Sequence, residues 1–127
     1  MLKYCQRLGR FLLEPIELAR SIAEWIGDKK GENIVLTDLR PITTLADYFL
    51  ICEAPSDRQI NAITENIREN GKIAYDLLPL RVEGKGESGW VLMDYGRVVV
   101  HIFSPDMRRY YDLESLWNEA QVLLRVQ

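Results

Sequence analysis

Two stretches of the chain carry apolar residues at helical spacing. In the first, Pro15–Lys29, the apolar side chains share one face, and the leading proline suits the first turn of a helix. The second opens at Ser56, where Ser-Asp-Arg-Gln is a capping box: the Ser56 hydroxyl accepts from the backbone N–H of Gln59, whose side chain reaches back. We expect this second helix to weaken at Gly71 and to resume towards Tyr75.

Five shorter stretches are typical of β-strands. Asp47–Cys52 is apolar almost throughout, which indicates burial on both faces of a sheet, so we expect helices on both faces. Tyr95 and Gly96 separate the last two stretches and predict a tight hairpin. The predicted strands are Asn33–Leu39, Asp47–Cys52, Leu80–Glu83, Trp90–Asp94 and Val98–Phe103.

The end of the chain is predicted to be helical. Pro105–Tyr111 fits a turn or a short helix, and Leu113–Val126 fits a longer final helix because its apolar residues recur at helical spacing. The order is then helix, two strands, helix, three strands, helix. This order predicts an α/β fold, a single domain with a mixed five-stranded sheet flanked by helices.

A chain of 127 residues has room for one domain. We assign residues 1–14 to a short basic N-terminal tail, since Lys3, Arg7 and Arg10 occur there before any acidic residue, and residues 15–127 to the domain. The formal net charge of -3 disfavours a protein that coats nucleic acid by itself, because such proteins need clustered Lys and Arg.

Cysteine and histidine are too few for a disulfide framework or a zinc site. Cys5 and Cys52 are the only cysteines, and Cys52 lies in an apolar run, so we expect a buried thiol there. No apolar run approaches the ~20 residues that span a bilayer. Because Glu14 and Pro15 also interrupt any signal-peptide pattern, we predict a cytoplasmic protein without a membrane segment or a metal.

The segment Gly84–Gly89 matches the pattern G-x-G-x-x-G. In a dinucleotide-binding unit these glycines follow a strand and open a helix, whose N-terminus holds the pyrophosphate. Here the segment leads into the strand that begins at Trp90. We interpret it as a flexible loop between strands and predict no nucleotide cofactor.

Three aspartates, Asp38, Asp47 and Asp94, lie in or at the end of predicted strands. Carboxylates gathered on one sheet could hold Mg²⁺ for nucleotidyl transfer. A nucleotidyltransferase would also need a Gly-Ser phosphate turn and a close Asp-x-Asp pair, and the sequence has neither. Catalysis by these residues is the alternative to the more ordinary role of strand-end aspartates, which is to fix turns.

His101 is the only histidine and lies between Val100 and Ile102 in the last predicted strand. A catalytic triad would need a Ser or Cys nucleophile on a sharp turn, and the sequence offers no obvious one. A hydrogen-bonded structural histidine is therefore the favoured interpretation.

Aromatic residues are dense in the C-terminal third. Trp117 lies on a helical stripe and is interpreted as core, whereas Trp90 enters a strand directly after the glycine-rich loop. Tyr95, at a turn tip, is poorly placed for a core. Because Trp and Tyr are frequent interface anchors, Trp90 is a candidate partner-binding residue, with core packing as the alternative.

Six motifs follow one another along the chain between Asn33 and Trp117, and the resemblance that they carry covers nearly everything from Ile16 to Trp117. They are NIVLTDLRPIT (Asn33–Thr43), LADYFLIC (Leu45–Cys52), SDRQINAI (Ser56–Ile63), LPLRVEG (Leu78–Gly84), GWVLMDYGRVVVHIF (Gly89–Phe103) and YYDLESLW (Tyr110–Trp117). In content and order they resemble the ribosomal silencing factor family, also called Iojap or RsfS.

The resemblance implies a non-catalytic protein that binds the large ribosomal subunit through that subunit's fourteenth protein. On the face that meets the small subunit, it would block subunit joining and lower translation when nutrients are short. At most a minor contact with ribosomal RNA is expected, and a homodimer is one expected state of the free protein. The implied fold is related to nucleotidyltransferases without their catalytic apparatus.

The resemblance also implies site residues. The interface tryptophan of the family corresponds to Trp90, and Asp94, Tyr95, Arg108 and Tyr111 match positions in its C-terminal motifs. We carry these over as residues that form or support the interface.

One departure from the family changes a charge. Where the family usually has an acid after Asp-Tyr-Gly, this chain has Arg97. We expect Arg97 to project into solvent beside the docking surface. An arginine would be repelled by a basic partner, so we favour an acidic patch or RNA phosphate opposite it. The alternatives are a basic partner, for which Arg97→Asp would strengthen binding, and a solvated turn residue that takes no part in binding.

Overall fold

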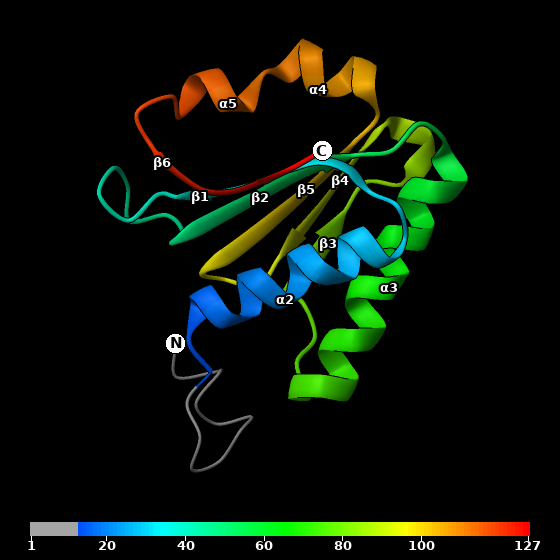
Figure 1. The fold of residues 1–127 in the computed structure, drawn as a ribbon. Coiled ribbons are helices and arrows are strands. Elements are labelled where there is room, and N and C mark those ends of the chain that lie inside the picture. The colour runs from blue at the N-terminus through cyan, green and yellow to red at the C-terminus, as the bar shows by residue number, and fades with distance from the viewer. Residues whose placement is uncertain (1–12) are drawn as a thin grey trace.

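The computed structural model describes residues 13–127. A mixed six-stranded sheet runs through this part of the chain in the order β3-β4-β5-β2-β1-β6, with α2 and α3 on one face and α4 and α5 on the other (Figure 1). The elements are α2 (Pro15–Asp28), β1 (Glu32–Asp38), β2 (Tyr48–Glu53), α3 (Asp57–Tyr75), β3 (Arg81–Glu83), the 3₁₀ turn η1 (Gly86–Ser88), β4 (Trp90–Asp94), β5 (Val98–Phe103), α4 (Pro105–Tyr111), α5 (Leu113–Leu116) and β6 (Gln121–Val126). The predicted α/β domain with helices on both faces is confirmed, with one strand more than expected.

Helix α2 begins at the proline that the sequence indicated. The backbone N–H of Glu14 donates to the side chain of Glu17 at 3.2 Å, which fixes the first turn. Leu13, just before the helix, is buried and belongs to the core. The rest of the predicted tail, residues 1–12, lies outside the described residues.

The capping box of α3 is confirmed in one half and wrong in the other. The Ser56 hydroxyl accepts from the backbone N–H of Gln59 at 3.2 Å, as predicted. The Gln59 side chain does not reach back: its amide donates to the carbonyls of Lys29 and Lys30 at 3.2 and 2.9 Å. Carbonyl groups at the C-terminus of a helix have no partner within the helix. By donating to two such carbonyls, Gln59 ties the end of α2 to the start of α3.

The expected weakening of α3 is wrong, because the helix continues without a break to Tyr75. Gly71 is buried within it, and a Cβ there would lie 3.2 Å from the carbonyl oxygen of Leu77. The glycine serves close packing against the returning chain rather than a break in the helix.

The face of the sheet under α2 and α3 holds the main core. Cys52 lies in this layer as the buried thiol that the sequence predicted, and burial raises its pKa to about 12. The side chains that are 0% exposed there include Ile22 and Ile26 of α2, Ile60, Ile63 and Ile67 of α3, and Leu50, Val100 and Ile102 of the sheet.

The predicted final helix Leu113–Val126 is wrong. Helix α5 ends at Leu116, and Gln121–Val126 forms β6, which pairs antiparallel with β1 at the edge of the sheet. A short apolar run fits either a helix or a strand by spacing alone. The free edge of β1 favours the strand, because its backbone N–H and C=O groups pair with Gln121–Val126.

The glycine-rich loop is packed against α3 rather than flexible. Gly86 is buried, and its backbone N–H donates to the Asn61 side chain at 2.9 Å. A Cβ on Gly86 would come within 2.3 Å of the carbonyl oxygen of Asp57. Gly86 therefore allows close backbone contact with α3, whereas Gly84 and Gly89 adopt positive φ angles that favour glycine.

Candidate protein-docking site

A row of aromatic rings lies on the sheet face under α4 and α5. Cross-strand pairing of β4, β5 and β2 brings their alternate side chains together there, since successive side chains of a strand point to opposite faces. Neighbouring ring centroids are 4.4 to 6.3 Å apart, which are the separations of rings in direct contact. This aromatic row consists of Trp117, Phe49, His101, Phe103, Trp90 and Tyr111.

Trp90 lies at the end of the row near β3. Its ring stacks on Phe103 at a centroid distance of 5.2 Å and meets Tyr111 of α4 at 4.4 Å. Its indole Nε1–H donates to Nδ1 of His101 at 3.2 Å. Trp90 is nevertheless only partly buried, so part of its surface remains available to a partner.

Trp90 forms part of the wall of an open hollow of about 300 Å³. The hollow lies between β4 and α4, and most of its lining is apolar. Trp90 and Tyr111 are the members of the aromatic row that line it. Its lining residues are Glu83, Gly84, Ser88, Trp90, Leu92, Met107 and Tyr111.

His101 is buried at the centre of the row and is 4% exposed. Burial lowers its pKa to about 4, so the ring is neutral at pH 7 and Nδ1 can accept the Trp90 hydrogen bond. The predicted hydrogen-bonded structural histidine is confirmed.

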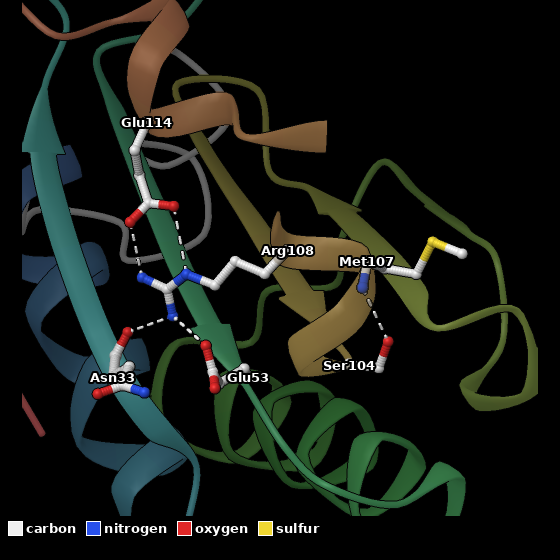
Figure 2. A network of polar contacts seen from close by, with 6 residues as sticks. All are labelled: Asn33, Glu53, Ser104, Met107, Arg108 and Glu114. Atoms are coloured by element: carbon white, nitrogen blue, oxygen red, sulfur yellow. Dashed lines mark hydrogen bonds and ion pairs between the residues drawn. The ribbon is translucent and has the colours of Figure 1, made fainter. Parts of the chain in front are cut away.

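Arg108 holds α4 and α5 onto the sheet (Figure 2). Its guanidinium binds Glu114 of α5 through two hydrogen bonds of 3.2 and 2.9 Å, and also Glu53 of β2 at 3.1 Å and the carbonyl of Asn33 at 2.6 Å. The Arg108 side chain is only 10% exposed, so it is poorly placed to meet a partner directly. Its position instead supports the placement of Tyr111, three residues later on the same helix.

Three of the predicted interface residues, Asp94, Tyr95 and Arg97, lie at the other end of the β4–β5 hairpin. From Trp90 to Asp94 the strand covers ~13 Å, at ~3.3 Å per residue. There the carboxylate of Asp94 accepts from the backbone N–H of Gly96 at 2.7 Å and fixes the turn. The expectation that Arg97 projects freely into solvent is wrong, because its guanidinium pairs with Asp47.

Tyr95 belongs to the core and is 1% exposed, so the expectation that it is poorly placed for a core is wrong. A residue at a turn tip can be buried when α3 packs over that turn, and the Tyr95 hydroxyl lies near Gly71 of this helix. Any part of Tyr95 in an interface is therefore a supporting one.

The three aspartates of the enzyme alternative do not form a metal site. Asp38 alternates with Leu36 on the face of α2 and α3, whereas Asp94 lies on the opposite face with Trp90. Each carboxylate is paired with an arginine: Asp38 with Arg40, Asp47 with Arg97 and Asp94 with Arg81. Between residues 13 and 127, no group of three His, Cys, Asp or Glu side chains is placed to hold a metal ion.

The sequence singled out Trp90 and Tyr111, which meet in the hollow, but not Leu92 and Met107, which also line it. Leu92 follows Trp90 by two residues in one strand, so the alternation of side chains along a strand could have predicted that both lie on the same face. Met107 precedes Tyr111 by four residues, which places both on one side of a helix. Tyr110, which is 77% exposed and contacts Tyr111, extends the aromatic surface.

The family model for "Ribosomal silencing factor during starvation" matches residues 13–127. The chain belongs to the ribosomal silencing factor family. Membership makes the ribosome its partner and silencing of the ribosome its general role. None of the helices from residue 13 onward is long and apolar enough to cross a membrane.

Relatives from distant organisms agree with this membership. Ribosomal silencing factor RsfS of Bacillus subtilis is 45% identical over 97 residues, which cover 73% of this chain and 78% of that protein. RsfS of Halalkalibacterium halodurans is 40% identical over 106 residues, covering 82% and 88%. The chloroplastic protein Iojap of Zea mays is 31% identical over 84% of this chain and 46% of its own length.

Solved structures show the same fold. The crystal structure of protein CV0518 from Chromobacterium violaceum superposes with a TM-score of 0.79 at 33% identity, over 84% of this chain and 88% of the other. A Bacillus halodurans crystal structure superposes with a TM-score of 0.71 at 37% identity, over 80% and 94%.

Proposed function

We propose that this protein docks on the large ribosomal subunit through the fourteenth protein of that subunit, on the face that meets the small subunit. Occupation of that face blocks subunit joining and represses translation under nutrient limitation. The protein acts in the cytoplasm as a binding factor rather than an enzyme. Contact with ribosomal RNA is minor, and a homodimer is a state of the free protein.

The observation that carries this proposal is the open hollow formed by Trp90, Leu92, Met107 and Tyr111. Interface anchors are usually aromatic residues near the centre of a contact, where neighbouring groups exclude water. The hollow combines a half-buried tryptophan with an exposed tyrosine on rigid elements, outside the main core. In a ribosomal silencing factor, this is the surface best built to grip a protein partner.

The charge of the chain fits a protein partner rather than bare RNA. The net charge is -3, and the acidic residue in the wall of the hollow is Glu83, whose side chain is 57% exposed. Glu83 pairs with Arg81, so it is the net charge of the chain that favours a protein partner. Ribosomal proteins are generally basic, and a net negative chain meets a basic protein more readily than RNA phosphate.

Sedimentation with purified large subunits tests the proposal. We expect the protein to co-sediment with isolated large subunits and to inhibit their pairing with small ones. Trp90→Ala should weaken binding by ~2 kcal/mol, or about thirtyfold. Ile73→Ala is the matched control, because Ile73 is an apolar residue of α3 that is 81% exposed, outside the hollow.

Migration of the wild-type protein apart from large subunits at micromolar concentration would overturn the proposal. If Trp90→Ala instead melts far below the wild type, as removal of a core tryptophan would at ~3–5 kcal/mol, Trp90 loses its assigned role. Calorimetry with nucleoside triphosphates and Mg²⁺ distinguishes the binding factor from the nucleotidyltransferase-like enzyme, since a binding factor should give no heat on mixing with these ligands.

A further inference from the structure

The aromatic row contains a buried imidazole, His101, where an apolar ring would fill the space equally well. His101 packs edge-on against Phe49 at 4.8 Å and lies parallel to Phe103 at 6.0 Å, as a phenylalanine could. Its Nε2 is buried without a hydrogen-bond partner among the described residues. Burial of a polar nitrogen without a partner costs free energy, so packing alone does not explain the histidine.

The other nitrogen of the ring has a specific partner. Nδ1 of His101 accepts the indole N–H of Trp90 at 3.2 Å. The indole nitrogen is a donor only, and a neutral imidazole can accept through the nitrogen that carries no proton. The hydrogen bond of this buried imidazole is thus made with Trp90, a residue of the proposed docking site.

This bond limits how Trp90 can lie in the hollow. Its stacking on Phe103 and its contact with Tyr111 are apolar and tolerate rotation of the indole, whereas a hydrogen bond is directional. With its N–H turned inward to His101, Trp90 offers a partner only its carbon edge and ring face. The hollow then presents a preformed apolar surface rather than a mobile side chain.

We infer that His101 is a positioning residue for docking: it fixes the orientation of Trp90 through the Nδ1 hydrogen bond and so preorganises the hollow for an apolar group of the ribosomal partner. This inference rests on the proposed function. A preorganised anchor binds more tightly because its side-chain freedom is already lost before association.

Two substitutions separate positioning from packing. His101→Phe keeps a ring of similar shape and removes both the Nδ1 acceptor and the partnerless Nε2. It should melt at or above the wild-type temperature, yet bind large subunits about five- to tenfold more weakly. His101→Asn places an oxygen near the former Nδ1 and loses the rest of the ring. It should melt at a lower temperature but keep more of the affinity than His101→Phe.

Nuclear magnetic resonance of ¹⁵N-labelled protein supplies a readout that needs no ribosome. The indole N–H resonance of Trp90, assigned by its loss in Trp90→Phe, should shift and exchange faster with solvent in His101→Phe. It should stay close to its wild-type position in His101→Asn. Adding His101→Phe to Trp90→Phe should then cost no further affinity, because the hydrogen bond is already absent.

Each outcome decides the inference. Wild-type affinity in His101→Phe, or an unchanged Trp90 resonance, would overturn it while leaving the proposed function intact. Equal loss of binding in Trp90→Phe with and without His101→Phe supports it even if His101→Asn does not fold. Absence of binding by the wild-type protein would overturn the proposed function, and the docking role of His101 with it.

Discussion

The two faces of the sheet are covered in different ways. Under α2 and α3 the layer is mostly aliphatic, and residues such as Ile22, Ile63 and Val100 are completely buried. Under α4 and α5 the layer is aromatic and partly polar: His101 lies among the rings, Arg108 pairs with Glu53 and Glu114, and α5 spans only Leu113–Leu116.

The difference shows how one sheet can serve both stability and binding. Aliphatic side chains in close packing gain free energy mainly from burial, which has no preferred direction. Hydrogen bonds and ion pairs to Trp90 and Arg108 are directional, and they hold aromatic groups in place without burying them completely. The first face therefore keeps the domain folded, and the second presents the hollow.

The largest expected effect is on the aliphatic face. Ile63→Ala should lower the free energy of unfolding by ~2–5 kcal/mol, because Ile63 is 0% exposed and its removal leaves a cavity between α3 and the sheet. Chemical denaturation measures this loss. Affinity of the folded fraction for large subunits should be unchanged, and a specific loss of affinity would contradict the division between the faces.

The next effect concerns the ion pairs under α4 and α5. Arg108→Met should cost ~3 kcal/mol of stability, because the carboxylates of Glu53 and Glu114 then lose their partner. It should also loosen Tyr111 from Trp90 and weaken binding to large subunits. Denaturation and sedimentation measure the two effects.

The control for Arg108 removes the unpaired charges as well. Adding Glu53→Gln and Glu114→Gln to Arg108→Met should recover part of the stability without restoring the affinity. Recovery of both stability and affinity would mean that the ion pairs of Arg108 with Glu53 and Glu114 contribute only to folding.

Acid should destabilise the protein through His101. Burial lowers the pKa of His101 from its ordinary value of 6.5 to about 4 in the folded state, so between these values the unfolded chain binds a proton that the folded chain excludes. The free energy of unfolding should fall by roughly 3 kcal/mol as the pH drops through that window. The hydrogen bond from Arg40 lowers the pKa of the Asp38 carboxyl below 3.8. The stability that Asp38 contributes is therefore lost mainly below the pH window of His101.

Denaturation of the wild type and of His101→Phe at pH values between 4.5 and 7 measures the acid effect. The variant should lack the part of the slope due to His101. Identical slopes in the two proteins would show that the imidazole is protonated without penalty, and that the neutral buried ring is a wrong assignment.

The smallest effect is expected at Arg97. Arg97→Asp places a second carboxylate beside Asp47 and removes a pair whose arginine is 37% exposed, so stability should fall by ~1 kcal/mol or less. If Arg97 meets an acidic patch or RNA phosphate, association with large subunits should slow, most at low salt. Association rates at two salt concentrations give the sign, with Arg97→Gln as the control that removes charge without reversing it.

Most of the regular structure could be predicted from local pattern. The apolar stripes of α2 and α3, the hydroxyl cap at Ser56 and the β4–β5 hairpin are signals that lie within a few neighbouring residues. Trp90 could be singled out for the same reason, since its loop and strand are adjacent in sequence. Its contact with Tyr111, 21 residues later, could not be predicted from spacing.

The sequence by itself determined which segments would be amphipathic, where the chain would turn, and to which family it belongs. Tertiary structure decided the rest: the edge of β1 made Gln121–Val126 a strand, α3 buried Tyr95, and partners distant in sequence drew Arg108 and Arg97 into ion pairs. Hydrophobic period is a property of neighbouring residues, whereas the burial of a turn or the partner of a charge depends on what the folded chain brings beside it.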